Sequence, residues 1–416
     1  MALGGSCTSD PEPRPASIDE PSTPPEAEYT GGGGRGGDEE SCSDVVPVPT
    51  PDDREGWANA LARYSLEGPT VWCLGENDHG VAESTAVYLH LLRHLIVEHD
   101  VRTIGVESVG ATADHLNRYV ATGDEAEIDQ AFREIPGSLA ASDNRREFYK
   151  ELRSIGRSLN IDLRIEGFDV AVQRSGTIDA LSRFLDDAEV ETSRRETCLD
   201  AAPVDAEVAA EACGTLVSQL EGDRAELEAT VGSDRVWRGI RDARNLESGH
   251  RFLEYQERGS FSLGSSFREG AMLANIERIR TQVGSERPLV LTAHNSHCGS
   301  GYRVGRDPET AAPQWSFGSA LEESLGQGYQ AIGQFYLGGI RTSSFSGGEE
   351  AYPDTSNGLE AAIAAVAVGP GAILPTSTCA VDLTERMRTG WGDRVIAADS
   401  FQHLIWLREV SATTLE

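Results

Sequence analysis

Residues 70–84 read TVWCLGENDHGVAES, an apolar run that ends in a group of ionisable side chains. The apolar part predicts a buried strand over 70–74, and the helical spacing of apolar residues that follows predicts a helix near 80–99. The ionisable side chains between them are Glu76, Asp78, His79 and Glu83. Unpaired charges at the edge of a core are costly. The rest of the sequence decides whether they form a turn, a metal site or a catalytic centre.

The same alternation of strand and helix continues along the chain. Further strands are predicted at 103–107, 163–168, 288–293 and 330–337, and within 395–409. Helical patterns fill the intervals, and residues 173–283 read as a charged helical lobe. This order predicts an α/β fold with a mainly parallel sheet flanked by helices. We expect the lobe to lie over the carboxyl ends of the strands.

The first 54 residues differ in composition from the rest of the 416-residue chain. They are rich in Pro, Gly, Ser and Glu, so they bury too little apolar surface to offset the entropy of ordering. We expect a disordered tail over 1–54 and a folded domain over 55–416. Cys7 in this tail suits a cell-surface lipoprotein anchor if the true start lies upstream. The alternative is a soluble protein with a plain flexible tail.

The charge balance is strongly acidic, with a net charge of −32, and Lys150 is the only lysine. Such a chain is repelled by phosphate, which excludes nucleic acid and anionic membranes as partners. Few lysines and many carboxylates favour a halophilic protein, because at 1 M salt the Debye length falls to about 3 Å and screens the repulsion. An acidic protein from ordinary salt is the alternative.

The seven cysteines show neither CxxC nor any other metal spacing, so the sequence predicts no zinc ribbon and no disulfide scaffold. Cys198 and Cys213 are close enough in sequence to pair, whereas Cys298 is interpreted as a packing residue. No apolar run reaches the eighteen residues of a membrane-spanning helix.

Polar clusters follow four of the predicted strands, at the point where each strand ends. These residues are Glu76 and His79, Glu107, Asp169, and His294 and His297. Because parallel strands place their carboxyl ends at one edge of a sheet, where ligands bind, we expect the clusters to converge on one cleft.

Other ionisable residues have simpler explanations. Asp78 is expected to cap the following helix, and Glu83 either complements the dipole of that helix or contacts substrate. The remaining histidines are interpreted as surface or core residues: His90, His94, His99, His115, His250 and His403.

Five motifs resemble the erythromycin esterase-like family, in order, over about residues 65–410. GENDHG at 75–80 with the later Glu107 is similar to its GExxHG…E pattern. The other four are EGFDV (166–170), REGAMLAN (268–275), LTAHNSH (291–297) and ALEESLGQGYQAIGQFY (320–336). The resemblance implies hydrolysis of an ester or lactone, with His79 as general base. It also implies that Glu76, Glu107, His294 and His297 are site residues.

One position departs from the family. Many members carry an arginine nine residues after the catalytic histidine, and Tyr88 stands there in this chain. This departure puts macrolide hydrolysis in doubt. We expect Arg268, Asp169 and Glu83 to contact the small-molecule substrate.

No GxSxG motif is present, so we expect direct attack by water rather than an acyl-enzyme. Protonated His294 or His297, or Arg268, could then stabilise the oxyanion. No cofactor is expected in this mechanism. One alternative is a hydrolase in which the same residues hold a divalent metal. Another is a surface lipoprotein that binds a haem- or iron-type ligand without catalysis.

Overall fold

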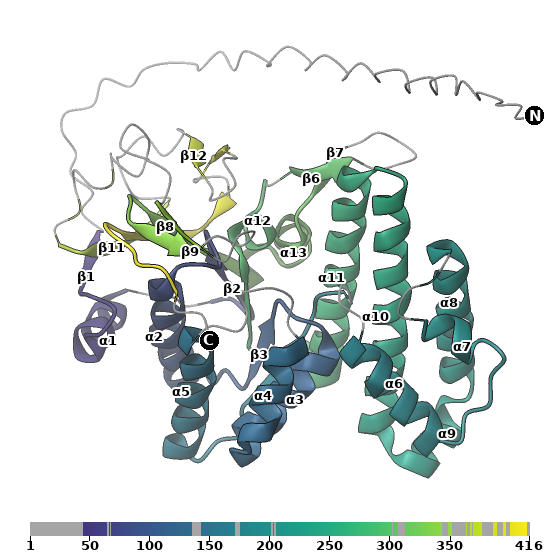
Figure 1. Cartoon of the computed structure of the whole chain (residues 1–416). Helices are drawn as coiled ribbons and strands as arrows, with labels where there is room; N and C mark the ends of the chain where they lie inside the picture. The colour runs from purple at the N-terminus through teal and green to yellow at the C-terminus, as the bar shows by residue number, and fades with distance from the viewer. Residues whose placement is uncertain are drawn as a thin grey trace, which may run out of the picture. The chain divides into compact units, whose positions relative to one another are not determined.

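The central feature of the fold is an eight-stranded sheet, in the order β1-β11-β14-β8-β2-β5-β3-β4 (Figure 1). The computed structural model describes residues 45–64, 66, 68–134, 143–170, 175–200, 203, 205–301, 303–306, 313–342, 348–351, 363, 367, 369–376, 386–388, 394–396 and 400–413. The strands of this sheet are β1 (Val46–Val48), β2 (Val71–Glu76), β3 (Thr103–Val106), β4 (Arg164–Gly167), β5 (Leu289–His294), β8 (Tyr329–Tyr336), β11 (Gly371–Pro375) and β14 (His403–Leu407).

From β14 to β4 every neighbouring pair of strands is parallel, whereas β1 and β11 continue the sheet antiparallel. The predicted mainly parallel α/β sheet is therefore confirmed. Three two-stranded ribbons lie outside it: β6 (Arg303–Arg306) with β7 (Pro313–Trp315), β9 (Ile340–Thr342) with β10 (Glu349–Ala351), and β12 (Arg386–Arg388) with β13 (Arg394–Ile396).

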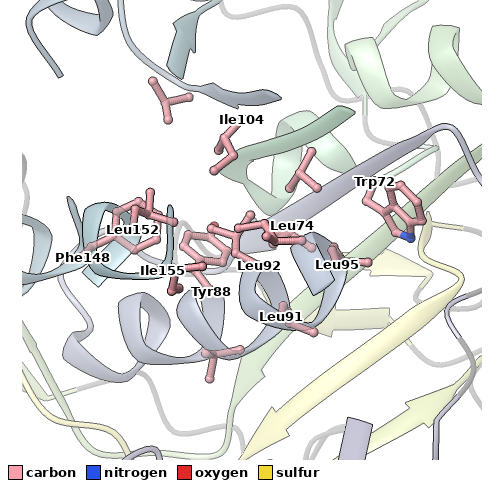
Figure 2. Packing of buried hydrophobic residues seen from close by; sticks show 14 of the residues in the cluster. Trp72, Leu74, Tyr88, Leu91, Leu92, Leu95, Ile104, Phe148, Leu152 and Ile155 are labelled. Carbon is pink, nitrogen blue, oxygen red and sulfur yellow. The ribbon is translucent and has the colours of Figure 1, made fainter. Parts of the chain in front are cut away.

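Helices cover both faces of the sheet. Side chains of β2 point alternately to the two faces and so contact both groups of helices. The first group of helices is α1 (Arg54–Arg63), α2 (Ala82–Glu98), α3 (Gly110–Thr122), α4 (Glu125–Glu134) and α5 (Asp143–Leu159). Trp72 and Leu74 point to the face that this group covers, whereas Val71 and Cys73 point to the other. Figure 2 shows Tyr88 and Leu92 of α2 between Leu74 and the apolar side of α5.

The opposite face packs against α11 (Phe261–Val283) and α13 (Phe317–Leu325), through Met272, Ile276 and Phe317. A short helix, α12 (Asn295–Cys298), follows β5 directly, and a 3₁₀ turn, Gly326–Gly328, leads into β8. Because α11 passes beside the ends of β3, β4 and β5, its side chains reach the carboxyl edge of the sheet.

Residues 175–257 are mostly helical and have a core of their own. The helices before α11 are α6 (Ser175–Asp187), α7 (Arg195–Cys198), α8 (Ala206–Gly222), α9 (Arg224–Val231) and α10 (Ser233–Glu257). Their third apolar cluster includes Leu181, Leu216 and Leu246. Cys198 and Cys213 form a disulfide between α7 and α8, as their proximity in sequence allowed.

One sequence expectation needs correction at the antiparallel edge, namely the boundary between tail and domain. The sheet begins inside the stretch expected to be a tail, because β1 pairs with β11, and helix α1 starts at Arg54. Pro47 within β1 is tolerated because an edge strand needs no donor on its outer side. Residues 1–44, including Cys7, lie outside the described part of the chain. In that described part, no helix is long and apolar enough to span a membrane.

Candidate active site

His79 lies at the carboxyl end of β2 and is held by a carboxylate. Its Nδ1 is 2.6 Å from Oε1 of Glu76, the last residue of β2. Nη2 of Arg145 donates to the same oxygen at 2.7 Å. Arg145 arrives there because the apolar side of α5 packs on α2, which places the first turn of α5 at the sheet edge. Among the described residues Nε2 of His79 has no hydrogen-bond partner, and its side chain is 27% exposed.

Glu107, directly after β3, joins two neighbouring strands and a helix. Its Oε2 accepts the backbone N–H of His294 at 2.8 Å, and its Oε1 accepts from Nη2 of Arg268 at 2.9 Å. Arg268 also donates to both oxygens of Asp169, at 2.8 and 2.7 Å. Asp169 follows β4, so Arg268 joins α11 to the end of β4 through this bidentate pair and to the end of β3 through Glu107.

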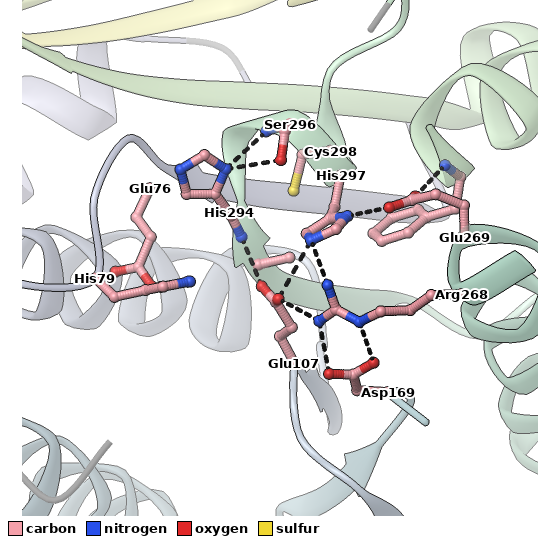
Figure 3. A network of polar contacts seen from close by, with 12 residues as sticks. Glu76, His79, Glu107, Asp169, Arg268, Glu269, His294, Ser296, His297 and Cys298 are labelled. Carbon is pink, nitrogen blue, oxygen red and sulfur yellow. Dashed lines mark hydrogen bonds and ion pairs between the residues drawn. The ribbon is translucent and has the colours of Figure 1, made fainter. Parts of the chain in front are cut away.

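His297 lies between two carboxylates, as Figure 3 shows. Its Nδ1 contacts Oε1 of Glu269, and its Nε2 lies 3.3 Å from Oε1 of Glu107. Glu269 is itself fixed, because its other oxygen accepts the backbone N–H of Phe317 at 2.9 Å. The imidazole also stacks on the ring of Phe317. Arg268 Nη1 comes within 3.4 Å of His297 Nε2, a contact of two donors when the imidazole is protonated.

His294 ends β5 and lies between the other two histidines, with ring centroids 5.4 Å from His79 and 6.4 Å from His297. Its Nδ1 accepts the N–H of Ser296, and its Nε2 lies 3.0 Å from the carbonyl oxygen of Asn77, which can only accept. The proton of the neutral ring therefore sits on Nε2.

A disulfide and a glycine hold the α12 segment against β2. Cys298, next to His297, is bonded to Cys73 in β2, so it is more than the packing residue that was expected. A side chain at Gly75 would place its Cβ 2.1 Å from Oδ1 of Asn295. Only glycine lets the two segments come this close, which brings Glu76 and His294 to the same edge.

The charges of the site follow from these contacts. Burial alone would raise the pKa of Glu76, but Arg145 and His79 bring it below its usual value. Burial likewise opposes ionisation of Glu107, yet His297, His79 and Arg268 hold its pKa well below the usual range. Both carboxyl groups are therefore charged at neutral pH.

The three histidines differ in protonation. Burial lowers the pKa of His79, but Glu76 and Glu107 raise it to a value above 6.5. Burial and the charges of His79 and His297 lower the pKa of His294 to about 3, so it stays neutral. Glu269 and Glu107 outweigh burial at His297 and raise its pKa to about 10. At neutral pH the edge thus holds a cation at His297 and a neutral ring at His294, while carboxylates raise the pKa of His79 above its usual value.

The structure brings together all but one of the site residues named from the sequence: Glu76, His79, Glu107, Asp169, Arg268, His294 and His297. The exception is Glu83, whose carboxylate accepts from the backbone and side chain of Ser411. Asp78 does not cap α2, since it accepts the N–H of Gly80 and pairs with Arg341. Tyr88 is buried and donates to the carbonyl of Ala293 at 3.1 Å.

Two residues of the site were missed from the sequence, Arg145 and Glu269. Arg145 lies in the charged run DNRREFYKELRS, which reads as a solvated helix face. Glu269 follows Arg268 on a helix with no clear apolar periodicity, so its inward direction had no signal. Among the residues that the structure describes, no group of three or more His, Cys, Asp or Glu side chains is arranged to hold a metal ion.

Solved structures with a similar fold are distant in sequence. An erythromycin esterase, EreC, in a histidine-to-asparagine mutant form and an open conformation, matches with a TM-score of 0.70 and 17% identity, over 88% of this chain and 98% of that one. A protein from Bacillus cereus matches with 0.69 and 15%, and a succinoglycan biosynthesis protein with 0.68 and 14%, each over 90% of this chain and 97% of the other. No protein with a curated description matches the sequence.

The sequence model of the erythromycin esterase family matches residues 96–402. Glu107, Asp169, Arg268, His294 and His297 lie within this range, whereas Glu76 and His79 precede it. The match extends over most of the chain, and so the protein belongs to the erythromycin esterase family, a family of esterase-type hydrolases.

Proposed function

We propose that this protein hydrolyses an ester or lactone of a small molecule by direct attack of water, with His79 as the general base. The observation that carries the proposal is how the imidazole of His79 is held and exposed. Glu76 orients its Nδ1, its Nε2 faces the side of Glu107 without a described partner, and the side chain is partly exposed (Figure 3). Glu76 and Glu107 raise the pKa of its imidazole, which makes it a stronger base for proton transfer.

In the first step, Nε2 of neutral His79 takes a proton from water while the water oxygen bonds to the carbonyl carbon. The carbonyl π electrons move to oxygen and form a tetrahedral oxyanion. Glu76 stabilises the imidazolium that results. The oxyanion then re-forms the carbonyl, the bond to the alkoxide breaks, and His79 returns the proton to the leaving oxygen. The products are an acid and an alcohol.

The oxyanion must be stabilised by a positively charged group or a hydrogen-bond donor. The protonation and contacts of the two histidines leave the arginines as the better candidates. Neutral His294 directs its Nε2 proton to Asn77, which argues against the role of charged donor that the sequence suggested. His297 is charged, but its two nitrogens face Glu269 and Glu107. The guanidinium groups of Arg268 and Arg145 are partly exposed, at 24% and 29% of their side chains, and either can face the substrate.

Arg145 also gives a reason why Tyr88 need not abolish activity. The position of Tyr88 lacks the arginine that many family members have, yet a guanidinium beside Glu76 is supplied by α5 instead. We expect Arg145 to supply the positive charge from a different element, and therefore a substrate of different shape from a macrolide.

The test is a panel of ester and lactone substrates in molar salt, with wild-type protein and His79→Ala. His94→Ala is the matched control, since His94 is a half-buried histidine on α2 outside the site. Hydrolysis by the wild type and the control, and its loss in His79→Ala, would support the proposal. Full activity of His79→Ala would overturn it. Activity that disappears with a chelator and returns with a divalent ion would favour the metal-dependent alternative.

A further inference from the structure

A pocket lined by arginines and by the carboxylates of Glu221, Glu228, Asp234 and Glu277 lies in the helical lobe. Its volume is about 580 Å³, and residues of α8, α9, α10 and α11 line it. Four of these are arginines: Arg224, Arg241, Arg244 and Arg278. Trp237 forms part of the wall. None of the residues assigned to the proposed hydrolysis lines this pocket.

Three of the four arginines have carboxylate partners. Arg241 forms a bidentate pair with Asp114 at 3.0 and 2.8 Å. Arg244 pairs with Glu221 through Nη2, and Arg224 lies 3.9 Å from Glu228. These three charges are therefore compensated within the protein.

Arg278 differs from the other three. Within the described part of the chain its only hydrogen bond is to Oδ1 of Asn275, and no carboxylate lies within 4.0 Å. Asn275 cannot compensate a charge, and its Nδ2 already donates to Phe168 and Asn245. The charged guanidinium thus faces the pocket with hydrogen-bonding capacity left, because it has five N–H donors.

Arg244 also lines the pocket, and within the described structure one of its donors lacks a partner. Its Nε is buried and has no hydrogen-bond partner among the described residues. A buried N–H without a partner costs about 1–3 kcal/mol, so such groups in native proteins call for an explanation. The two guanidinium groups also repel each other: burial and the charge of Arg244 lower the pKa of Arg278 to about 10, against smaller opposite effects of Glu221 and Glu247. At neutral pH Arg278 remains charged.

We propose that this pocket binds a multivalent oxyanion of the phosphate type, held by Arg278 and Arg244. One such ion carries enough oxygens to accept from both guanidinium groups, and its charge relieves their repulsion. The acidic surface of the chain opposes entry of any anion, so binding depends on these two arginines rather than on the overall field.

The experiment is calorimetric titration of the full chain with inorganic phosphate at constant ionic strength. We expect binding by the wild type and at least a tenfold loss of affinity in Arg278→Gln and in Arg244→Gln. The matched control is Arg235→Gln, which removes one charge from α10 at a half-exposed residue outside the pocket. It should bind phosphate as the wild type does.

Circular dichroism of each variant separates loss of the site from loss of the fold. Absence of phosphate binding by the folded wild type would overturn the proposal. Equal affinity in Arg278→Gln and Arg235→Gln would overturn it too, because the anion would then respond to net charge alone. Ester hydrolysis plays no part in these measurements, so they stand apart from the function proposed above.

Discussion

His79 and His297 lie at the same edge of the sheet, and each is paired with a glutamate through Nδ1, yet the two sites differ in kind. His79 has one carboxylate partner and a side chain that is 27% exposed. His297 has two carboxylate neighbours and is 10% exposed. The first imidazole is open to solvent, whereas the second is a cation at neutral pH. The number of neighbouring carboxylates, more than the presence of a Glu–His pair, sets how strongly each histidine holds its proton.

We expect the largest effect on activity from removal of the imidazole of His79. In His79→Asn we expect kcat to fall by roughly 10²–10⁴-fold, the usual contribution of a general base. The thermal midpoint should stay close to that of the wild type, because a partly exposed side chain with one hydrogen bond is lost. Turnover within twofold of the wild type would show that His79 is not the base.

Removal of the other imidazole should act on stability. In His297→Gln, Glu269 and Glu107 keep their negative charges at the buried edge without the cation between them. We expect a loss of about 3–5 kcal/mol in the free energy of unfolding, as when one partner of a buried pair is removed. Chemical denaturation measures this loss. His79→Gln is the matched control, and equal losses in the two variants would remove the distinction between the sites.

The same contrast predicts how stability depends on pH. The pKa of His297 is about 10 in the folded protein and near 6.5 when unfolded, so the folded state holds the proton more tightly. The contribution of protonated His297 to the free energy of unfolding is therefore fully present below pH 6.5 and is lost as pH rises towards 10. The difference in unfolding free energy between wild type and His297→Gln should shrink over this range. A difference that is constant from pH 6 to pH 10 would contradict a raised pKa.

For His79, pH should affect the rate instead. Its pKa lies above 6.5, and the protonated form cannot accept a proton from water, so kcat/KM should rise as pH increases through that pKa. Glu76→Gln removes the charge that raises the pKa and should move this limb to lower pH, with a reduced plateau. Rate profiles from pH 5 to pH 9 measure the shift. An unmoved limb would mean that another group controls it.

The smallest effect is expected at Glu83. Its carboxylate contacts Ser411 rather than the histidines, so Glu83→Gln should leave kcat and KM unchanged. Stability should change by no more than about 0.5 kcal/mol, as for most surface substitutions. A clear rise in KM would instead place Glu83 at the substrate, as the sequence suggested.

Much of the fold could be predicted because each central strand is a short apolar run bounded by turns. The runs at β2, β3, β4, β5 and β8 were recognised within about two residues at each end. The antiparallel edge could not be predicted from the sequence, because β1 has only three residues and contains a proline in a Pro-rich stretch. Its pairing with β11 is a contact between segments over 300 residues apart, which local patterns do not encode.

The residues of the site likewise fall into those that the sequence predicted and those that it did not. Residues at strand ends were found because parallel topology brings strand ends together, whatever the loops do. Arg145 and Glu269 project from helices, where direction depends on how each helix rotates against the sheet. The protonation of each histidine could not be predicted from the sequence either, because it depends on neighbouring charges that only the folded structure brings together. The hydrolytic roles of these residues remain a prediction.

The Cys73–Cys298 disulfide has a consequence for the order in which the protein is built. It joins residues separated by 225 positions and, in the chain-entropy account, restricts the unfolded ensemble by roughly 5 kcal/mol. Both cysteines are fully buried once the sheet is complete. An oxidant must therefore reach them while β2 and β5 are still coming together. The last histidine of the site is locked in place only after nearly three quarters of the chain has been synthesised, by a bond that a reducing refolding buffer would prevent.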